Sequence, residues 1–120
     1  MGLKDMLLKQ NLVHQNILDD YIIDLAWSPN GNYLAAITGS GQVALTNMNV
    51  DVLWNELGRH KHSVNSMKWH PHEPFLASGG QDGKLTVWDI SSNKAAWSQE
   101  IGGWIDCLSW SSLGHFLASS

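Results

Sequence analysis

Three copies of one hydrophobic pattern run along the chain. In each copy a tryptophan follows an apolar residue by two positions, and a Leu-Ala pair begins seven positions after that tryptophan. The tryptophans are Trp27, Trp69 and Trp110, so successive copies are separated by 42 and 41 positions. A period of about 40–45 residues is typical of repeats that each form four strands. We therefore expect a chain of repeated small sheets.

The second copy shows the strands of one unit most clearly. Apolar residues at Val64, Met67 and Trp69 predict a strand with a bulge, because strict alternation breaks between Val64 and Met67. A tight turn is expected over residues 79–83, where glycine tolerates a positive φ. Three further strands are predicted, over residues 75–78, 85–88 and 95–101. Together the four strands form one antiparallel meander.

This unit resembles a WD repeat. Residues 76–90 contain the Trp88-Asp89 dipeptide, and His60 precedes the first strand by four residues, where the family usually places the His of a Gly-His pair. Arg59 stands at the Gly position of that pair, which departs from the family's pattern. The resemblance covers residues 21–120 and implies an all-β fold of WD-repeat β-propeller blades, each a four-stranded antiparallel meander.

The repeat divides the chain into four segments. Residues 1–20 form an N-terminal segment in which residues 12–18 are expected to be a strand that latches a ring; a short helix followed by a linker is the alternative. Residues 21–58 are expected to form a degenerate blade, residues 59–101 a complete blade and residues 102–120 a truncated third blade. We therefore expect an open arc that is part of a longer propeller, with closure between several copies of the chain as the alternative.

The resemblance implies a structural relay of hydrogen bonds in the complete blade, made by His60, Ser78, Asp82 and Trp88. Asp82 would accept from His60, which bonds the Ser78 hydroxyl, and Ser78 would accept from the Trp88 indole. Each buried polar group then has a partner. A Ser-His-Asp hydrolase triad is the rival interpretation. Because Ser78 would be held by Trp88 rather than exposed at a pocket, we expect no catalytic residue and no enzyme.

The relay is not expected in the first copy. Thr46-Asn47 replaces the Trp-Asp pair, Ser40 stands where the aspartate would be, and Leu18 occupies the histidine position. Apolar packing should hold this blade together. In the third copy Ile101 occupies the histidine position.

Function is expected on the loops at the ends of the blades. By resemblance, the partner-binding positions are Tyr21, Ser63, Asn65, Gln81, Trp104 and Asp106. Tyr21 and Trp104 are the best candidates, because exposed aromatic residues often anchor protein interfaces, although packing against a neighbouring blade is the alternative. These residues favour a non-catalytic scaffold that mediates protein–protein interactions. A substrate-recognition or sensor arm of a larger multidomain enzyme or regulatory protein is the second hypothesis.

Charge and composition narrow the range of partners. The net charge is −4, with seven Lys and Arg against eleven Asp and Glu, so we expect no nucleic-acid binding. No apolar window is long enough to span a membrane, and the single Cys107 favours a reducing compartment, so we expect a cytoplasmic protein. Residues 60–62 and 70–72 each read His-X-His, but both lie in predicted loops without a nearby cysteine. We therefore expect no metal and no cofactor.

Overall fold

The computed structural model describes residue 18, residues 20–47 and residues 54–120, and all regular structure in this part of the chain is β-strand. The first sheet is antiparallel in the order β1-β2-β3-β4. Its strands are β1 (Ile22–Trp27), β2 (Tyr33–Thr38), β3 (Gln42–Asn47) and β4 (Trp54–Arg59). Apart from Leu18, the strand predicted over residues 12–18 lies outside the described residues.

The second sheet repeats this plan in the order β5-β6-β7-β8. Its strands are β5 (Val64–Trp69), β6 (Phe75–Gly80), β7 (Lys84–Asp89) and β8 (Lys94–Glu100). A two-stranded sheet follows, made by β9 (Leu108–Trp110) and β10 (Leu117–Ser119). The predicted four-stranded antiparallel meander is confirmed in both large sheets.

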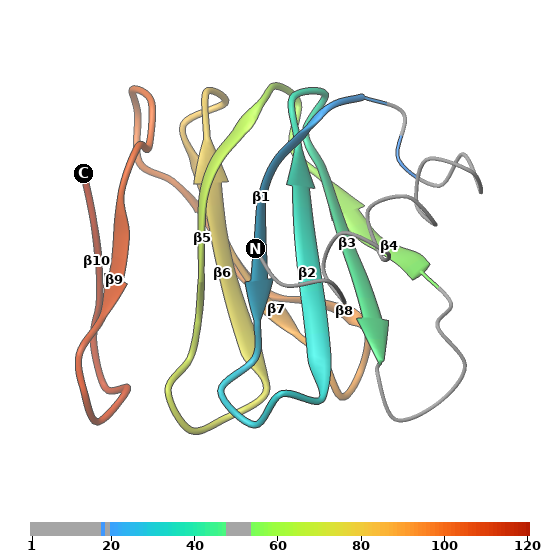
Figure 1. Cartoon of the computed structure of the whole chain (residues 1–120). Coiled ribbons are helices and arrows are strands. Elements are labelled where there is room, and N and C mark those ends of the chain that lie inside the picture. Colours follow the sequence, from blue (N-terminus) through green and yellow to red (C-terminus); the bar gives the residue numbers. More distant parts are fainter. Residues whose placement is uncertain (1–17, 19, 48–53) are drawn as a thin grey trace.

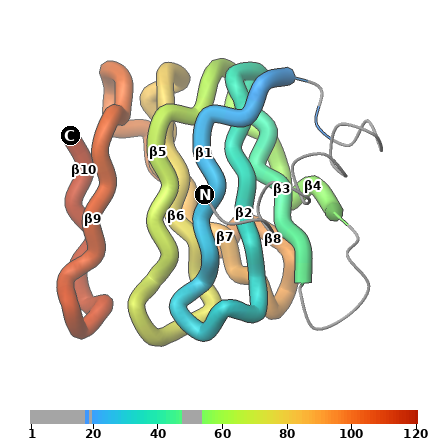
Figure 2. Tube along the Cα trace, viewed as in Figure 1, coloured from blue at the N-terminus to red at the C-terminus, as the bar shows by residue number. Residues whose placement is uncertain are grey.

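The three sheets stand side by side, as Figure 1 and Figure 2 show. The first strands of the sheets are neighbours, because β5 contacts β1 on one side and β9 on the other. None of the described sheets closes on itself. The described chain is therefore an open arc of sheets, which confirms the expected partial propeller.

A bulge recurs at the start of the first strand in both large sheets. The register shifts between Ile22 and Asp24 in β1, and between Val64 and Ser66 in β5. The second shift confirms the bulge that broken alternation predicts. Gly80 lies opposite, where a Cβ would collide with the Ser63 carbonyl oxygen. Only glycine fits at this position, because the bulged backbone comes so close.

The predicted turn over residues 79–83 is shorter in the structure. Gly79 and Gly80 continue β6, and Gly80 pairs with Val64. A Cβ on Gly79 would press against the side chain of Ile105, which belongs to the neighbouring sheet. The first two glycines of this run therefore serve close packing rather than chain reversal, and sequence pattern does not separate the two roles.

The core lies mainly between neighbouring sheets rather than within one sheet. Its largest cluster joins buried residues of both large sheets, with Ile37 and Val43 on one side and Val64 and Leu76 on the other. A second cluster joins the second sheet to Ile105 and its neighbours. Neighbouring sheets thus bury apolar residues against each other, as repeat units must, while a further cluster lies on the first sheet alone.

Tryptophan side chains join neighbouring sheets at their first strands. The indole N–H of Trp69 donates to the Ala26 carbonyl oxygen over 3.0 Å, and that of Trp110 donates to the Lys68 carbonyl oxygen over 3.0 Å. Both side chains are partly buried. They therefore combine apolar packing with a main-chain hydrogen bond across the junction, which periodicity alone does not predict.

Candidate functional site

Four polar side chains of the second sheet and the segment before it form a continuous chain of hydrogen bonds. The Trp88 indole N–H donates to Ser78 Oγ over 2.8 Å, and Ser78 Oγ lies 2.7 Å from His60 Nε2. His60 Nδ1 lies 3.0 Å from Asp82 Oδ2. A carboxylate only accepts, so His60 carries a proton on Nδ1 and its Nε2 accepts from the Ser78 hydroxyl. The structure thus brings together all four residues expected in the relay.

Asp82 is positioned by the turn between β6 and β7. Gly83 allows this turn by adopting a φ of 70°. Asp82 Oδ1 accepts the Lys84 N–H over 3.0 Å, and Oδ2 accepts the Lys61 N–H over 3.3 Å. The carboxylate therefore joins the turn to the segment that leads into β5.

Burial and hydrogen bonding determine the charges of this pair. Burial lowers the pKa of His60, and the Asp82 carboxylate offsets only part of that effect. Burial by itself would raise the pKa of Asp82, but the Lys84 N–H, the His60 ring and the Lys61 N–H together lower it. Near neutral pH the pair is therefore a neutral imidazole that donates to a carboxylate.

The same chain of hydrogen bonds also has the acid-histidine-serine order of a hydrolase triad, in Asp82, His60 and Ser78. The surroundings of these residues decide between a structural relay and a catalytic triad. The exposed fraction is 0 % for Ser78 and 4 % for His60. The Ser78 oxygen already accepts the Trp88 indole N–H, and its O–H donates to His60 Nε2. A nucleophile must be reachable by a substrate carbonyl. This burial favours a structural role for the chain of hydrogen bonds.

The first sheet has a hydrogen bond between two short hydroxyl side chains, where the second sheet has the relay. Thr38 Oγ1 lies 3.1 Å from Ser40 Oγ and accepts the Gln42 N–H over 3.0 Å. Leu18, at the histidine position, packs against the apolar cluster of this sheet. The first sheet therefore combines a local hydroxyl bond with apolar packing.

Trp104 is the most prominent side chain among the residues expected to bind a partner. Its exposed fraction is 64 %. The loop that carries it is nevertheless held at both ends, because the Ile101 N–H bonds the Gly83 carbonyl over 2.8 Å and the Ile105 N–H bonds the Gly80 carbonyl over 2.9 Å. A large aromatic surface is thus presented on a positioned loop.

The other expected residues of the second and third sheets lie at the same end of the strands. Asn65 Nδ2 donates to Asp106 Oδ1 over 3.2 Å, which links the second sheet to the third. The Gln81 N–H donates to the Ser63 carbonyl over 3.0 Å. In Figure 1 this is the end where β5 begins and β6 ends. The structure thus brings four of the six residues together in two bonded pairs.

Tyr21 begins the first sheet at the same end. Its exposed fraction is 66 %, but its ring also lies against Gly39, where a Cβ would meet the ring carbons. Tyr21 is therefore exposed, and the packing contact that it makes lies within its own sheet rather than against a neighbouring blade.

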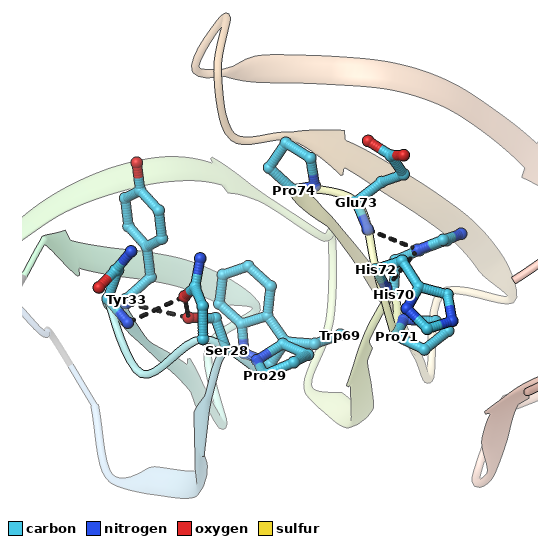
Figure 3. Close-up of a pocket in the computed structure, with 11 residues that line it drawn as sticks. Ser28, Pro29, Tyr33, Trp69, His70, Pro71, His72, Glu73 and Pro74 are labelled. Carbon is cyan, nitrogen blue, oxygen red and sulfur yellow. Dashed lines mark hydrogen bonds between the residues drawn. The ribbon is translucent and has the colours of Figure 1, made fainter. Parts of the chain in front are cut away.

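A groove that the sequence pattern does not predict lies at the opposite end of the strands. It separates the β1–β2 turn from the β5–β6 turn, and its volume is about 550 Å³ (Figure 3). The rings of Tyr33 and Trp69, which stack with centroids 6.3 Å apart, are part of its lining, as are Glu73 and Pro74.

The two histidines of residues 70–72 contact the third sheet. His70 Nε2 donates to the Gly114 carbonyl and His72 Nε2 donates to the Ser112 carbonyl, each over 3.0 Å. His70 Nδ1 accepts the N–H groups of His72 and Glu73. Within the described residues no group of three or more His, Cys, Asp or Glu side chains could hold a metal ion.

The repeat offered a signal for this contact. Ser28 and Ser111 occupy the position of His70 in the other copies, and each accepts an N–H bond within its own turn. A histidine at this position can accept N–H bonds within its own turn through one ring nitrogen, although from other residues than the serines do, and reach the next sheet with the other.

Comparison with known proteins gives a family match. The model of the anaphase-promoting complex subunit 4 WD40 domain matches residues 25–113. Over 105 residues the chain is 32 % identical to the probable cytosolic iron-sulfur protein assembly protein 1 of Cryptococcus neoformans, which covers 69 % of the chain and 24 % of that relative. Over 116 residues it is 33 % identical to the anaphase-promoting complex subunit cdc20 of Dictyostelium discoideum, which covers 92 % and 22 %.

A third relative is similar over a shorter stretch. The small ribosomal subunit protein RACK1 of Glycine max is 32 % identical over 68 residues, which covers 57 % of the chain and 21 % of the relative. The chain thus spans less than a quarter of the length of each of these three relatives. The described residues contain no helix with the length and apolar character needed to cross a membrane.

Proposed function

Because the chain belongs to the WD-repeat family, whose members are in general protein-interaction scaffolds or regulators, we propose that it is a non-catalytic scaffold that binds a protein partner. The observation that carries the proposal is Trp104, which is exposed on a loop held by two main-chain hydrogen bonds. Aromatic side chains that are exposed and positioned before binding are typical anchors of protein interfaces.

The proposed partner-binding surface consists of Tyr21, Ser63, Asn65, Gln81, Trp104 and Asp106. Asn65 and Asp106 bond each other across the junction of the second and third sheets, so one partner can contact both sheets here. The relay supports this surface indirectly, since Asp82 holds the turn that follows Gln81. Within the proposal, His60, Ser78, Asp82 and Trp88 stabilise the sheet and do not touch the partner.

The experiment compares partner capture by single variants of the full chain. Trp104→Ala removes the proposed anchor, and Phe116→Ala is the matched control because Phe116 is an aromatic residue that is 75 % exposed in the β9–β10 turn, at the other end of the strands. Proteins retained from an extract of the source cells are identified by mass spectrometry. We expect a set that Trp104→Ala loses and Phe116→Ala keeps. Identical sets from both variants, with unchanged melting temperatures, contradict the proposal.

The proposal also covers nucleic acids, membranes and the location of the protein in the cell. A net charge of −4 supports the absence of nucleic-acid binding, which retention on a phosphate column at moderate salt would contradict. We also propose a cytoplasmic location and no membrane partner. Closure of one ring by several copies of the chain stays a prediction, which the molecular mass in solution tests.

A further inference from the structure

The junction between the second and third sheets is closed by two histidines. The rings of His70 and His72 donate N–H bonds to the carbonyl oxygens of Gly114 and Ser112. The His70 ring also packs on Trp110, with 4.8 Å between the ring centroids. Planar N–H donors beside a tryptophan therefore bind main-chain oxygens of the neighbouring turn.

The junction between the first and second sheets is open at the corresponding place. Ser28 and Asn30 occupy the repeat positions of His70 and His72. The Ser28 hydroxyl bonds the Asn30 side chain over 2.8 Å, so both short side chains stay within their own turn. The groove of about 550 Å³ lies where the histidines would otherwise reach across (Figure 3).

The acceptors used at the closed junction have counterparts in the groove. Ser112 and Gly114 correspond in the repeat to Pro71 and Glu73, and both of these residues line the groove. Trp110 likewise corresponds to Trp69, which also lines it. The open junction thus retains the tryptophan and the turn of the closed one, but has Ser28 and Asn30 in place of the two histidine rings.

The charge and shape of the groove favour a cation over a neutral donor. Among the described residues that line it, Glu73 carries the only charged side chain, and it is exposed. Trp69 is held in place by its bond to the Ala26 carbonyl, and Tyr33 stacks on it at an interplanar angle of 26°. Aromatic faces attract cations, and a guanidinium group both stacks on rings and pairs with carboxylates through its planar N–H donors.

We propose that this groove binds an arginine side chain presented by a peptide segment of a partner protein. The guanidinium supplies the N–H donors that His70 and His72 supply at the closed junction, lies against Trp69 and pairs with Glu73. The proposal rests on the protein-interaction function proposed above, but it concerns the opposite end of the strands from Trp104.

The direct test uses peptides that differ only in one side chain. The ¹⁵N-labelled full chain is titrated with the capped peptide Gly-Gly-Arg-Gly-Gly, and the indole N–H signal of Trp69 is followed by NMR. Matched peptides carry citrulline, which is planar and neutral, or lysine, which is charged but not planar. We expect the arginine peptide to shift the Trp69 signal at concentrations where the other two do not. No shift with arginine, or equal shifts with citrulline or lysine, overturns the proposal.

Two charge-removing variants test the role of the carboxylate. Glu73→Gln keeps the main-chain bonds of the turn and should weaken arginine-peptide binding about tenfold, or about 1.4 kcal/mol. Glu100→Gln removes an exposed charge on β8, outside the groove, and should leave binding unchanged. Equal affinity of the two variants overturns the proposal, provided that their amide spectra show the native fold.

A third variant separates this inference from the proposed function. Trp104→Ala should retain the arginine peptide, because Trp104 does not line the groove. If the peptide fails to bind while partner capture still depends on Trp104, the groove proposal is wrong and the proposed function stands. If the peptide binds while partner capture does not change on replacement of Trp104, the groove proposal stands and the proposed role of Trp104 is wrong.

Discussion

The Trp88 indole N–H donates to the Ser78 hydroxyl oxygen over 2.8 Å, deep inside the second sheet. This bond orients the serine, because an oxygen that accepts from the indole turns its own proton toward His60. The histidine accepts that proton at Nε2 and donates its Nδ1–H to Asp82. Four polar side chains are thereby satisfied, and the surface turn is coupled to the buried centre of the sheet.

Replacement of Asp82 by alanine should destabilise the fold strongly. It leaves the buried Nδ1–H of His60 without its acceptor and removes the bonds to the Lys84 and Lys61 N–H groups. We expect a loss of about 2–3 kcal/mol in the free energy of unfolding, measured by urea denaturation. Asp89→Ala, which removes one exposed bond to the Ser91 N–H, is the control and should cost less than about 1 kcal/mol. Equal losses in the free energy of unfolding for the two variants would show that the relay stabilises the fold no more than an exposed hydrogen bond does.

Acidification should destabilise the chain through the same pair. The pKa of His60 is lower in the folded protein than its ordinary value of 6.5, so the unfolded state binds more protons and stability falls as the pH drops below about 6.5. The pKa of Asp82 is also lowered, so a further loss is expected below about 3.8. Melting temperatures of the wild type and His60→Gln from about pH 7.5 to 5.5 test this. Parallel pH profiles would exclude a contribution from His60.

Ser78→Ala separates the structural role from the catalytic one. The change leaves the Trp88 indole and His60 Nε2 without their shared partner, so we expect a loss of about 1–3 kcal/mol in stability. Hydrolysis of a p-nitrophenyl ester by the folded variant should equal that of the wild type. Loss of an esterase activity with native melting behaviour would instead support the triad interpretation.

Two glycines with nearly the same φ, Gly31 and Gly114, allow a matched test of the contact with His70. Gly31 has a φ of 76° and open space around it, whereas Gly114 has a φ of 78° and a Cβ there would collide with the His70 ring. Gly31→Ala should cost about 1 kcal/mol from the positive φ alone, and Gly114→Ala should cost distinctly more. The melting temperatures of both variants measure the difference.

A double variant identifies the source of that difference. His70→Ser places at this position the residue found in the other two copies and removes the ring that Gly114→Ala would meet. In the His70→Ser background, Gly114→Ala should therefore cost about as much as Gly31→Ala in the wild type. An undiminished excess cost would show that something other than His70 restricts this turn.

Within a single sheet, most features could be predicted from the sequence. The apolar residues Val64, Met67 and Trp69 predict β5, and the break in alternation between Val64 and Met67 predicts its bulge, because strand periodicity is local. The spacing of His60, Ser78, Asp82 and Trp88 matched a known repeat, and the structure brings these residues into one chain of hydrogen bonds. The roles of Gly79 and Gly80 could not be predicted, because a turn and a close approach both require glycine.

The repeat, the four-stranded meander and the departure of the first copy from the relay all follow from the order of the amino acids. The way in which neighbouring sheets meet does not: the three-dimensional packing shows that His70 reaches the Gly114 carbonyl, that Trp69 bonds the Ala26 carbonyl, and that a groove lies beside Ser28. Pairing within a meander follows from residues a few positions apart, whereas contacts between sheets depend on their relative orientation. That orientation results from the packing of the whole core, and residues about 42 positions apart come into contact through it.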